Sequence, residues 1–349
     1  MPKKTPTKSE TPAPSEDSRS AAHTGASPQG DHRYAVGIDF GGTFIKMALV
    51  NDDGQIVARR RIPTSDLSTR AGWVDAMAAG ILELAGEGPG DGAVPLAGVG
   101  IGVPGFVDFE RGHIFELPNV PGWSGVPLAG LMEERLSLRV RVDNDVNVMA
   151  TGECTFGAGR TYQHAVFMTL GTGVGGALLI NNRIYRGAHF MAGEMGHMSI
   201  DMHGVEGPMG RGCLERYAGN RRIVERAVRY LEAGQRSMLD AMCEGDRTRI
   251  DPLMIEKAAE QGDELSKTVY DEVADCLAAA LASITYLLQP QAFIIGGGVG
   301  QSGPILYEPL QRHLRERLNP LFADRLEIKK AALGNDAGVI GGATMVLLE

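Results

Sequence analysis

The sequence has 349 residues, of which 43% are hydrophobic and 22% are charged. This composition is typical of a globular protein, and the length is sufficient for two lobes. The net charge of −9 and the lack of a basic run longer than Arg59–Arg61 argue against binding to nucleic acid or acidic lipid. The four cysteines show no paired spacing and no segment is typical of a signal peptide or a membrane span, so we expect a cytoplasmic protein without disulfides.

Residues 1–33 are rich in Pro, Ser, Thr and charged residues and contain almost no large apolar side chain. Such a segment cannot bury enough surface to offset the loss of chain entropy, so we predict a disordered tail. A DNA-binding helix-turn-helix would need apolar periodicity here, and the segment has none.

The folded part is predicted to begin at Tyr34 with the strand AVGIDF, a glycine turn, the strand FIKMALV, a turn at 51–54 and the strand QIVARRRI. The same organisation returns at 165–185 as AVFMTL, GTGVGG, ALLI, the turn Asn181-Asn182 and RIY. This repeat predicts a duplicated α/β fold with one lobe per copy, in which each lobe offers a glycine loop to the cleft between them.

Apolar periodicity predicts helices at 71–84 and 265–288, and the second is expected to end before Pro290. The segment QAFIIGGGVG indicates a buried strand that runs into a glycine turn. The final segment, DAGVIGGATMVLL, indicates a helix whose small residues allow another element to pack closely.

The pattern G-x-G-x-x-G occurs three times, starting at Gly100, Gly171 and Gly298. A dinucleotide site needs a strand before the pattern and a helix after it. Pro104 interrupts the first copy and a hairpin follows the second, so we reject that interpretation for both, and no P-loop pattern is present. DFGGT and LGTGVGG remain as a pair of strand-to-glycine turns. They are either simple tight turns or backbone cradles for phosphate, and their equivalent places in the repeat favour phosphate.

Several short motifs occur in order across residues 34–349: DFGGT, VPGFVD, LPNVPGW, DNDVN, LGTGVGGALL, GEMGH and IIGGGVG. Together they resemble the ROK family of sugar kinases and sugar-responsive repressors. The resemblance implies a duplicated actin-like ATPase fold of the ribonuclease H-like type, with ATP and sugar meeting in the cleft between two lobes. We expect the small lobe to comprise residues 34–143 and 337–349, and the large lobe residues 144–336.

Transfer of a phosphoryl group to a sugar hydroxyl needs a group that accepts the hydroxyl proton, and a carboxylate is suited to this task. In DNDVN the candidate is Asp145, where the resemblance also places the catalytic base, with Asn144 beside it as a sugar ligand. The alternative is that these residues only cap the helix VNVMATGECTF. Both interpretations can hold together, and we expect Asp143 to be structural.

The resemblance assigns the remaining site residues. Glu194, His197 and Glu215 are expected to bind sugar hydroxyls, and Asn119 and Gly105 to line the sugar pocket. The residues expected to bind ATP and its Mg²⁺ are Asp39, Gly41, Gly42, Thr43, Gly171, Thr172, Gly173, Gly296, Gly297 and Gly298, with Asp39 holding Mg²⁺ through water.

Many family members carry a zinc site with the pattern C-x-C-G-x-x-G-C between the histidine and the last glutamate. In this chain the corresponding residues are 206–213, and only Cys213 of the cysteines remains. Because structural zinc prefers four nitrogen or sulfur ligands, we predict no protein-bound zinc. Another partner must then orient His197, and packing or a residue such as Arg211 or Pro208 must order the loop.

The sequence therefore predicts an ATP- and Mg²⁺-dependent hexose kinase, with glucose as the expected substrate and glucose 6-phosphate as the product. N-acetylglucosamine, N-acetylmannosamine and fructose are alternative substrates, and polyphosphate is an alternative donor. A sugar-sensing regulator without kinase activity is the alternative from another class; the retention of Asp145 argues against it. The family suggests a homodimer or homotetramer.

Overall fold

The computed structural model describes residues 32–67, 69–90, 92–118, 120 and 122–349. The predicted tail lies outside the described residues except for its last two positions, and so does the expected sugar ligand Asn119. Residues 33–349 form one compact unit. The predicted boundaries of two lobes within this unit stay a prediction.

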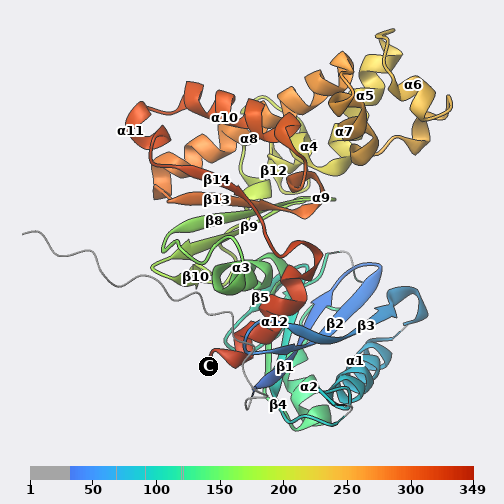
Figure 1. The fold of residues 1–349 in the computed structure, drawn as a ribbon, viewed down its shortest axis with the longest axis vertical. Helices are drawn as coiled ribbons and strands as arrows, with labels where there is room; N and C mark the ends of the chain where they lie inside the picture. The colour runs from blue at the N-terminus through green and yellow to red at the C-terminus, as the bar shows by residue number, and fades with distance from the viewer. Residues whose placement is uncertain (1–31, 68, 91, 119, 121) are drawn as a thin grey trace, which may run out of the picture. The chain divides into compact units, whose positions relative to one another are not determined.

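The first sheet has five strands in the order β3-β2-β1-β4-β7 (Figure 1). Strand β2 pairs antiparallel with both β1 and β3, whereas β4 pairs in parallel with both β1 and β7. Their bounds are Tyr34–Phe40 (β1), Phe44–Asn51 (β2), Ile56–Pro63 (β3), Leu96–Val103 (β4) and Val140–Asn144 (β7). The central strand β1 is apolar and buried along nearly its whole length because helices cover both faces of the sheet.

The second sheet repeats this arrangement in the order β10-β9-β8-β13-β14, with the same antiparallel and parallel pairs. Its strands are Ala165–Leu170 (β8), Val174–Ile180 (β9), Arg183–Tyr185 (β10), Ala292–Gly296 (β13) and Glu327–Lys330 (β14). The predicted turn between β9 and β10 is present: Asn181 and Asn182 both have positive φ, as the two central residues of a type I′ hairpin turn require. The duplicated fold predicted from the sequence is confirmed.

Helices cover each sheet on two faces. The longer ones are Arg70–Ala85 (α1), Leu128–Leu136 (α2), Asp145–Phe156 (α3), Asn220–Glu232 (α5), Pro252–Glu260 (α7), Glu264–Leu288 (α8), Pro304–Arg317 (α10) and Ala337–Leu347 (α12). The four-residue helices are Glu215–Ala218 (α4), Leu239–Met242 (α6), Gly297–Gly300 (α9) and Pro320–Ala323 (α11). Helices α1 and α2 share a core with the first sheet, while α5, α7, α8 and α10 share a larger core with the second.

Short elements complete the fold. The hairpins are β5 with β6, at Phe106–Asp108 and His113–Glu116, and β11 with β12, at Glu206–Gly207 and Gly210–Arg211. The 3₁₀ turns are Thr64–Asp66 (η1), Met195–His197 (η2), Arg247–Arg249 (η3) and Gly334–Asp336 (η4). Phe40, Trp73 and Trp123 form an aromatic cluster in the core of the first sheet. Trp123 is therefore a core residue.

The C-terminal helix α12 returns from the second sheet to cover the remaining face of the first, and it packs there against α3 (Figure 1). Its small residues make this possible, as predicted. A Cβ on Gly341 would lie 1.8 Å from the carbonyl oxygen of Val148 in α3, and a Cβ on Gly100 would lie 1.9 Å from the carbonyl oxygen of Gly342. Helix α3 covers the remaining face of the second sheet, so α3 contacts strands of both sheets.

Candidate active site

The carboxyl ends of the parallel strands in the first sheet bring distant parts of the sequence together. Asp39 in β1 lies opposite Gly102 in β4, and the next residue of β4, Val103, lies opposite Asn144 at the end of β7. Helix α3 begins at the following residue, Asp145. Ligands of open α/β sheets bind outside the carboxyl ends of the strands, so this edge is where a site is expected.

Asn144 is the N-cap of α3. Its Oδ1 accepts hydrogen bonds from the backbone N–H groups of Val146 at 2.9 Å and Asn147 at 3.3 Å. Its Nδ2 donates to the carbonyl oxygen of Gly105 at 3.1 Å. A Cβ on Gly105 would lie 2.2 Å from the carbonyl oxygen of Glu116, so a larger residue at position 105 would displace the carbonyl group that accepts from Asn144. The capping interpretation is confirmed for Asn144, and two residues expected to line the sugar pocket are in contact.

Asp145 is the first residue of α3, and its Oδ1 accepts a hydrogen bond from the N–H of Val146 at 2.9 Å. Burial raises the pKa of Asp145 to about 7, and the negative charges of Asp39 and Glu194 contribute in the same direction. The hydrogen bond from Val146 opposes the rise in pKa. A carboxyl group with a pKa near neutral pH is suited to accepting a proton during a reaction and releasing it afterwards.

Asp39 is paired with Lys46, whose Nζ lies 2.8 Å from its Oδ2. The two residues lie opposite each other in the β1–β2 hairpin, so the register of that hairpin produces the pair. Lys46 had no expected role, and the hairpin alternation was the sequence signal that could have linked it to Asp39. The pair leaves Asp39 half-buried at the same edge as Asp145.

Three residues expected to bind sugar lie near one another. The Nε2 of His197 lies 3.5 Å from the Oε2 of Glu194. Burial raises the pKa of Glu194, Glu215 raises it further, and His197 opposes the rise in pKa. Glu215 accepts a hydrogen bond at Oε2 from the N–H of Val174, at 3.0 Å, and so contacts the glycine turn between β8 and β9. Glu194 also interacts electrostatically with Asp145, which places this group beside the end of the first sheet.

The two glycine segments of the second sheet lie at neighbouring strand ends. Strands β8 and β13 are parallel, with Gly296 opposite Thr169. Gly297 has φ +80°, and a Cβ there would lie 2.3 Å from the carbonyl oxygen of Leu170, immediately before the turn that contains Gly171, Thr172 and Gly173. Only glycine tolerates both conditions. The fold therefore joins the two segments into one backbone surface.

Backbone in these turns faces open space. A Cβ placed on Gly42, Gly171 or Gly298 would meet no atom within 4 Å. Gly42 belongs to the turn between β1 and β2, which also contains Gly41 and Thr43, and the other two belong to the second sheet. These positions can therefore admit a ligand group close to the main chain, as phosphate binding by backbone N–H groups requires.

Comparison with known proteins identifies the family. The ROK family model matches residues 35–349. A glucokinase from Halalkalibacterium halodurans is 37% identical over 90% of this chain and 95% of its own length. A glucokinase from Thermotoga maritima is 34% identical over 89% of this chain and 96% of its own. The chain belongs to the ROK family.

A solved structure supports this assignment. The crystal structure of a ROK family glucokinase from Streptomyces griseus, in complex with glucose and AMPPNP, is 34% identical. It superimposes with a TM-score of 0.76 over 89% of this chain and 98% of that protein. The actin-like ATPase fold expected from the resemblance is thereby confirmed.

The loop that carries the zinc pattern in many ROK family members is ordered here by hydrogen bonds. The hydroxyl of Tyr217 donates to Asp201 Oδ2 at 3.2 Å and accepts from the N–H of Val205 at 3.0 Å. Arg211 forms an ion pair with Glu206 at 3.4 Å, and its role in ordering the loop stays a prediction. Tyr217, which lies two residues beyond Glu215 on α4, was not predicted to have a role. In the part of the chain that the structure describes, no three His, Cys, Asp or Glu side chains are grouped to hold a metal ion.

Two further charged residues were misjudged or missed. Glu153 lies on α3 but is not a solvated helix residue: its side chain is buried and accepts hydrogen bonds from the N–H groups of Ala158, Ala332 and Leu333. It fixes the segment that leads from β14 to α12. The other residue is Arg186, whose guanidinium pairs with the buried Asp143. No local pattern in the sequence indicates the contacts of Glu153 with Ala332 and Leu333 or of Arg186 with Asp143, because these partners are distant along the chain.

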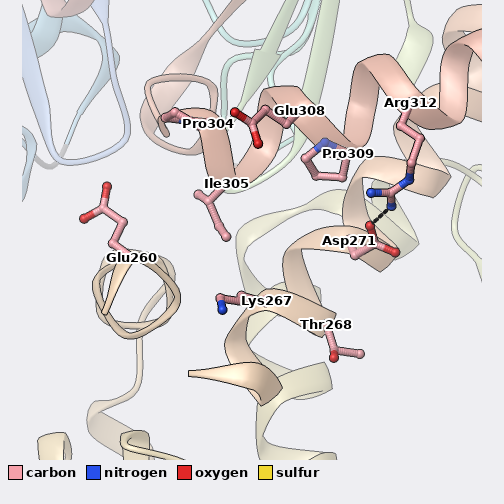
Figure 2. A pocket seen from close by; sticks show the side chains of 9 residues that line it. All are labelled: Glu260, Lys267, Thr268, Asp271, Pro304, Ile305, Glu308, Pro309 and Arg312. Carbon is pink, nitrogen blue, oxygen red and sulfur yellow. Dashed lines mark hydrogen bonds and ion pairs between the residues drawn. The ribbon is translucent and has the colours of Figure 1, made fainter. Parts of the chain in front are cut away.

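A cavity of about 780 Å³ lies between α7, α8 and α10. Figure 2 shows its mixed lining, in which Arg312 points toward Asp271 while Glu260 and Lys267 lie apart from them. None of its lining residues lies at the carboxyl ends of β1, β4 and β7, so this cavity is separate from the candidate active site. None of the helices in the described ranges combines the length and apolar character needed to cross a membrane.

Proposed function

We propose that this ROK family protein is a glucokinase, which transfers the γ-phosphoryl group of ATP to the 6-hydroxyl of glucose. The observation that carries the proposal is Asp145, a carboxyl group at the start of α3 whose pKa is raised to about 7 by burial and by the charges of Asp39 and Glu194. The relatives that are 34–37% identical over about nine-tenths of the chain support this choice of reaction.

The residues present fit ATP with Mg²⁺. When bound, these ligands supply the phosphoryl group and neutralise its negative charge. Gly41, Gly42 and Thr43 from the first sheet and the turns 171–173 and 296–298 from the second would hold the nucleotide through backbone N–H groups. Asp39 would hold Mg²⁺ through water, and Lys46 keeps the Asp39 carboxylate in place at 2.8 Å.

The chemical role of the chain is then small and specific. Asp145 would accept the proton of the 6-hydroxyl at a carboxylate oxygen as the new bond forms, since a free alcohol is too weak an acid to ionise beforehand. Its hydrogen bond from Val146 fixes the carboxylate against the start of α3. The fixed geometry matters because transfer depends on aligning the hydroxyl with the phosphorus.

Glu194, His197 and Glu215 would bind the other hydroxyls, together with Asn144, Gly105 and Asn119. Carboxylates bind two neighbouring hydroxyls at once, and a buried acceptor left unpaired by an epimer costs affinity. Asp145 also distinguishes this proposal from a sugar-sensing regulator, which has no need of a proton acceptor. The proposal includes two lobes with boundaries near 143–144 and 336–337, a cytoplasmic location and a homo-oligomeric state.

The test is ADP formation from ATP and Mg²⁺ in the presence of glucose, N-acetylglucosamine, N-acetylmannosamine or fructose, with a blank that lacks sugar. We expect glucose to give the highest kcat/KM. A higher value for another sugar would keep the kinase and replace the substrate. Sugar binding without ADP formation from any of the four, combined with retention on DNA at physiological salt, would contradict the kinase and favour the regulator.

A further inference from the structure

Arg186 connects the second sheet to Asp143, which lies two residues before the proposed proton acceptor Asp145. It follows β10, yet its Nε and Nη2 donate to Oδ2 of Asp143 at 2.9 and 2.7 Å. Asp143 lies in β7 of the first sheet, and its side chain is only 2% exposed. The guanidinium also lies over the ring of Phe109, 3.6 Å from its centroid. Charge pairing and stacking together fix the plane of the guanidinium.

The other carboxylate oxygen of Asp143 binds the residues at the start of α3, on either side of Asp145. Oδ1 accepts hydrogen bonds from the N–H of Asn144 at 2.8 Å and from Nδ2 of Asn147 at 3.1 Å. Asp145 lies between these two residues in sequence. The carboxylate of Asp143 therefore bridges the start of α3 on one side and Arg186 on the other, so a shift of Arg186 moves the turn that carries Asp145.

The backbone of Arg186 also holds the segment that carries the expected sugar ligands. Its carbonyl oxygen accepts a hydrogen bond from the N–H of Ala192 at 3.0 Å, which closes the turn leading to Glu194 and His197. One residue thus connects the proton acceptor through its side chain and the sugar segment through its main chain. Asp145 and the segment that carries Glu194 and His197 must be correctly placed relative to each other for the sugar hydroxyl to contact Asp145.

We propose that Arg186 is a positioning residue, which sets Asp145 relative to the bound sugar through the buried carboxylate of Asp143. The proposal rests on the proposed function, in which Asp145 accepts the proton of the sugar hydroxyl. In the described part of the chain, the hydrogen bonds of Arg186 go to Asp143, Ile184 and Ala192, which do not belong to the nucleotide turns. Its loss is expected to lower kcat and to raise KM for sugar, while KM for ATP changes little.

Removal of one partner of a buried ion pair also destabilises a protein, whereas removal of both charges together is often tolerated. The experiment therefore uses Arg186→Met, Arg186→Lys and the double variant Asp143→Asn/Arg186→Met. Arg183→Met is the matched control, because Arg183 is exposed and lies on β10, the strand that immediately precedes Arg186. For each variant kcat, both KM values and Tm are measured alongside the wild type.

We expect Arg186→Met to lower both Tm and kcat, the latter by at least about tenfold, as small displacements of a catalytic group do. The double variant should recover most of the Tm but keep the low kcat. Arg186→Lys, which keeps the charge but not the paired donors, should retain a Tm close to the wild-type value and lose several-fold in kcat. Arg183→Met should match the wild type in both.

Recovery of both Tm and kcat in the double variant would reduce Arg186 to a stabilising role and overturn the proposal. A kcat of Arg186→Met equal to that of the wild type would do the same. Each result leaves the kinase function standing, because the wild type turns over. A wild type that phosphorylates no sugar would instead overturn the proposed function, and the positioning role with it.

Discussion

Helices α3 and α12 occupy equivalent places in the duplicated fold, since each is the first helix of eight or more residues after the fifth strand of its sheet, and the two pack against each other. Each begins beside an aspartate with a different environment. Burial and the charges of Asp39 and Glu194 raise the pKa of Asp145 to about 7. Asp336 accepts hydrogen bonds from Arg59, one of them at 2.9 Å, and this lowers its pKa.

Asp145 and Asp336 thus occupy equivalent positions in the fold, and burial together with the neighbouring charged residues determines the protonation behaviour of each. An aspartate paired with arginine stays ionised and holds two elements together. An aspartate that lies among other acids at a sheet edge keeps its proton to higher pH and costs stability when it is ionised. Proteins retain such a cost where the group has a function. The same fold therefore makes one helix start a structural contact and the other a proposed proton acceptor.

The largest expected effect separates the two aspartates by activity. Asp145→Asn should lower kcat for glucose on the order of 10³-fold, because the amide cannot accept the hydroxyl proton, while glucose still binds. Asp336→Asn is the matched control and should change kcat less than about threefold, as expected for an ion pair near the surface. Steady-state ADP formation and calorimetric glucose titration measure both. An equal loss of binding and turnover in Asp145→Asn would indicate a folding role.

The next effect concerns the glycine turns of the second sheet. Gly297→Ala should destabilise the protein by about 2 kcal/mol, because φ is +80° and the Cβ would meet the carbonyl oxygen of Leu170. Gly298→Ala, at a position with open space and no positive φ, should leave the free energy of unfolding nearly unchanged. Urea denaturation measures both. Equal losses of stability in the two variants would contradict the close approach of Gly297 to the carbonyl oxygen of Leu170.

A smaller effect tests whether Asp145 costs stability. Its folded-state pKa is raised, so the unfolded protein holds the charge more easily, and the cost is fully present above pH 7 and disappears as pH falls toward 4. Asp145→Asn should therefore raise Tm at pH 8 by about 2 °C, which corresponds to roughly 1 kcal/mol, and the gain should shrink by pH 5. A lower Tm at pH 8 would show that the favourable interaction of the charge with the helix N-terminus dominates instead.

The smallest effect concerns the neighbours of Asp145. Asp39→Asn removes a negative charge that raises the pKa of Asp145, so the pH below which kcat/KM falls should move to a lower value, whatever activity the variant loses through weaker Mg²⁺ binding. The pH profile is compared with that of Asp75→Asn, which removes an exposed carboxylate on α1. A fall that begins at the same pH, or at a higher pH, would show that Asp39 does not act on Asp145.

Much of the fold could be predicted from the sequence, because its determinants are local. The AVGIDF and AVFMTL strands, the Asn181-Asn182 turn and the periodic helix 265–288 each carry their own signal. The short strands β5, β6, β11 and β12 were not predicted, since two to four residues show no periodicity. The close packing of α12 was predictable from Gly338, Gly341 and Gly342, but its partners were not.

The candidate site was predictable where a motif places residues together, as DNDVN and GEMGH do. Contacts between distant segments were not: Arg186 with Asp143, Glu153 with the 332–333 backbone and Tyr217 with Asp201 all depend on how the elements pack. The raised pKa of Asp145 was also out of reach, because it results from burial and from acids contributed by other elements.

The most direct test of the central claim is the pH dependence of kcat/KM for glucose in the wild type, which reports the pKa of the free enzyme. We expect a plateau above pH 8 and a fall in kcat/KM of about tenfold per pH unit below an apparent pKa near 7, as Asp145 becomes protonated. A profile that stays flat down to about pH 5, as an aspartate with its ordinary pKa would give, would contradict the claim that Asp145 accepts the proton with a raised pKa.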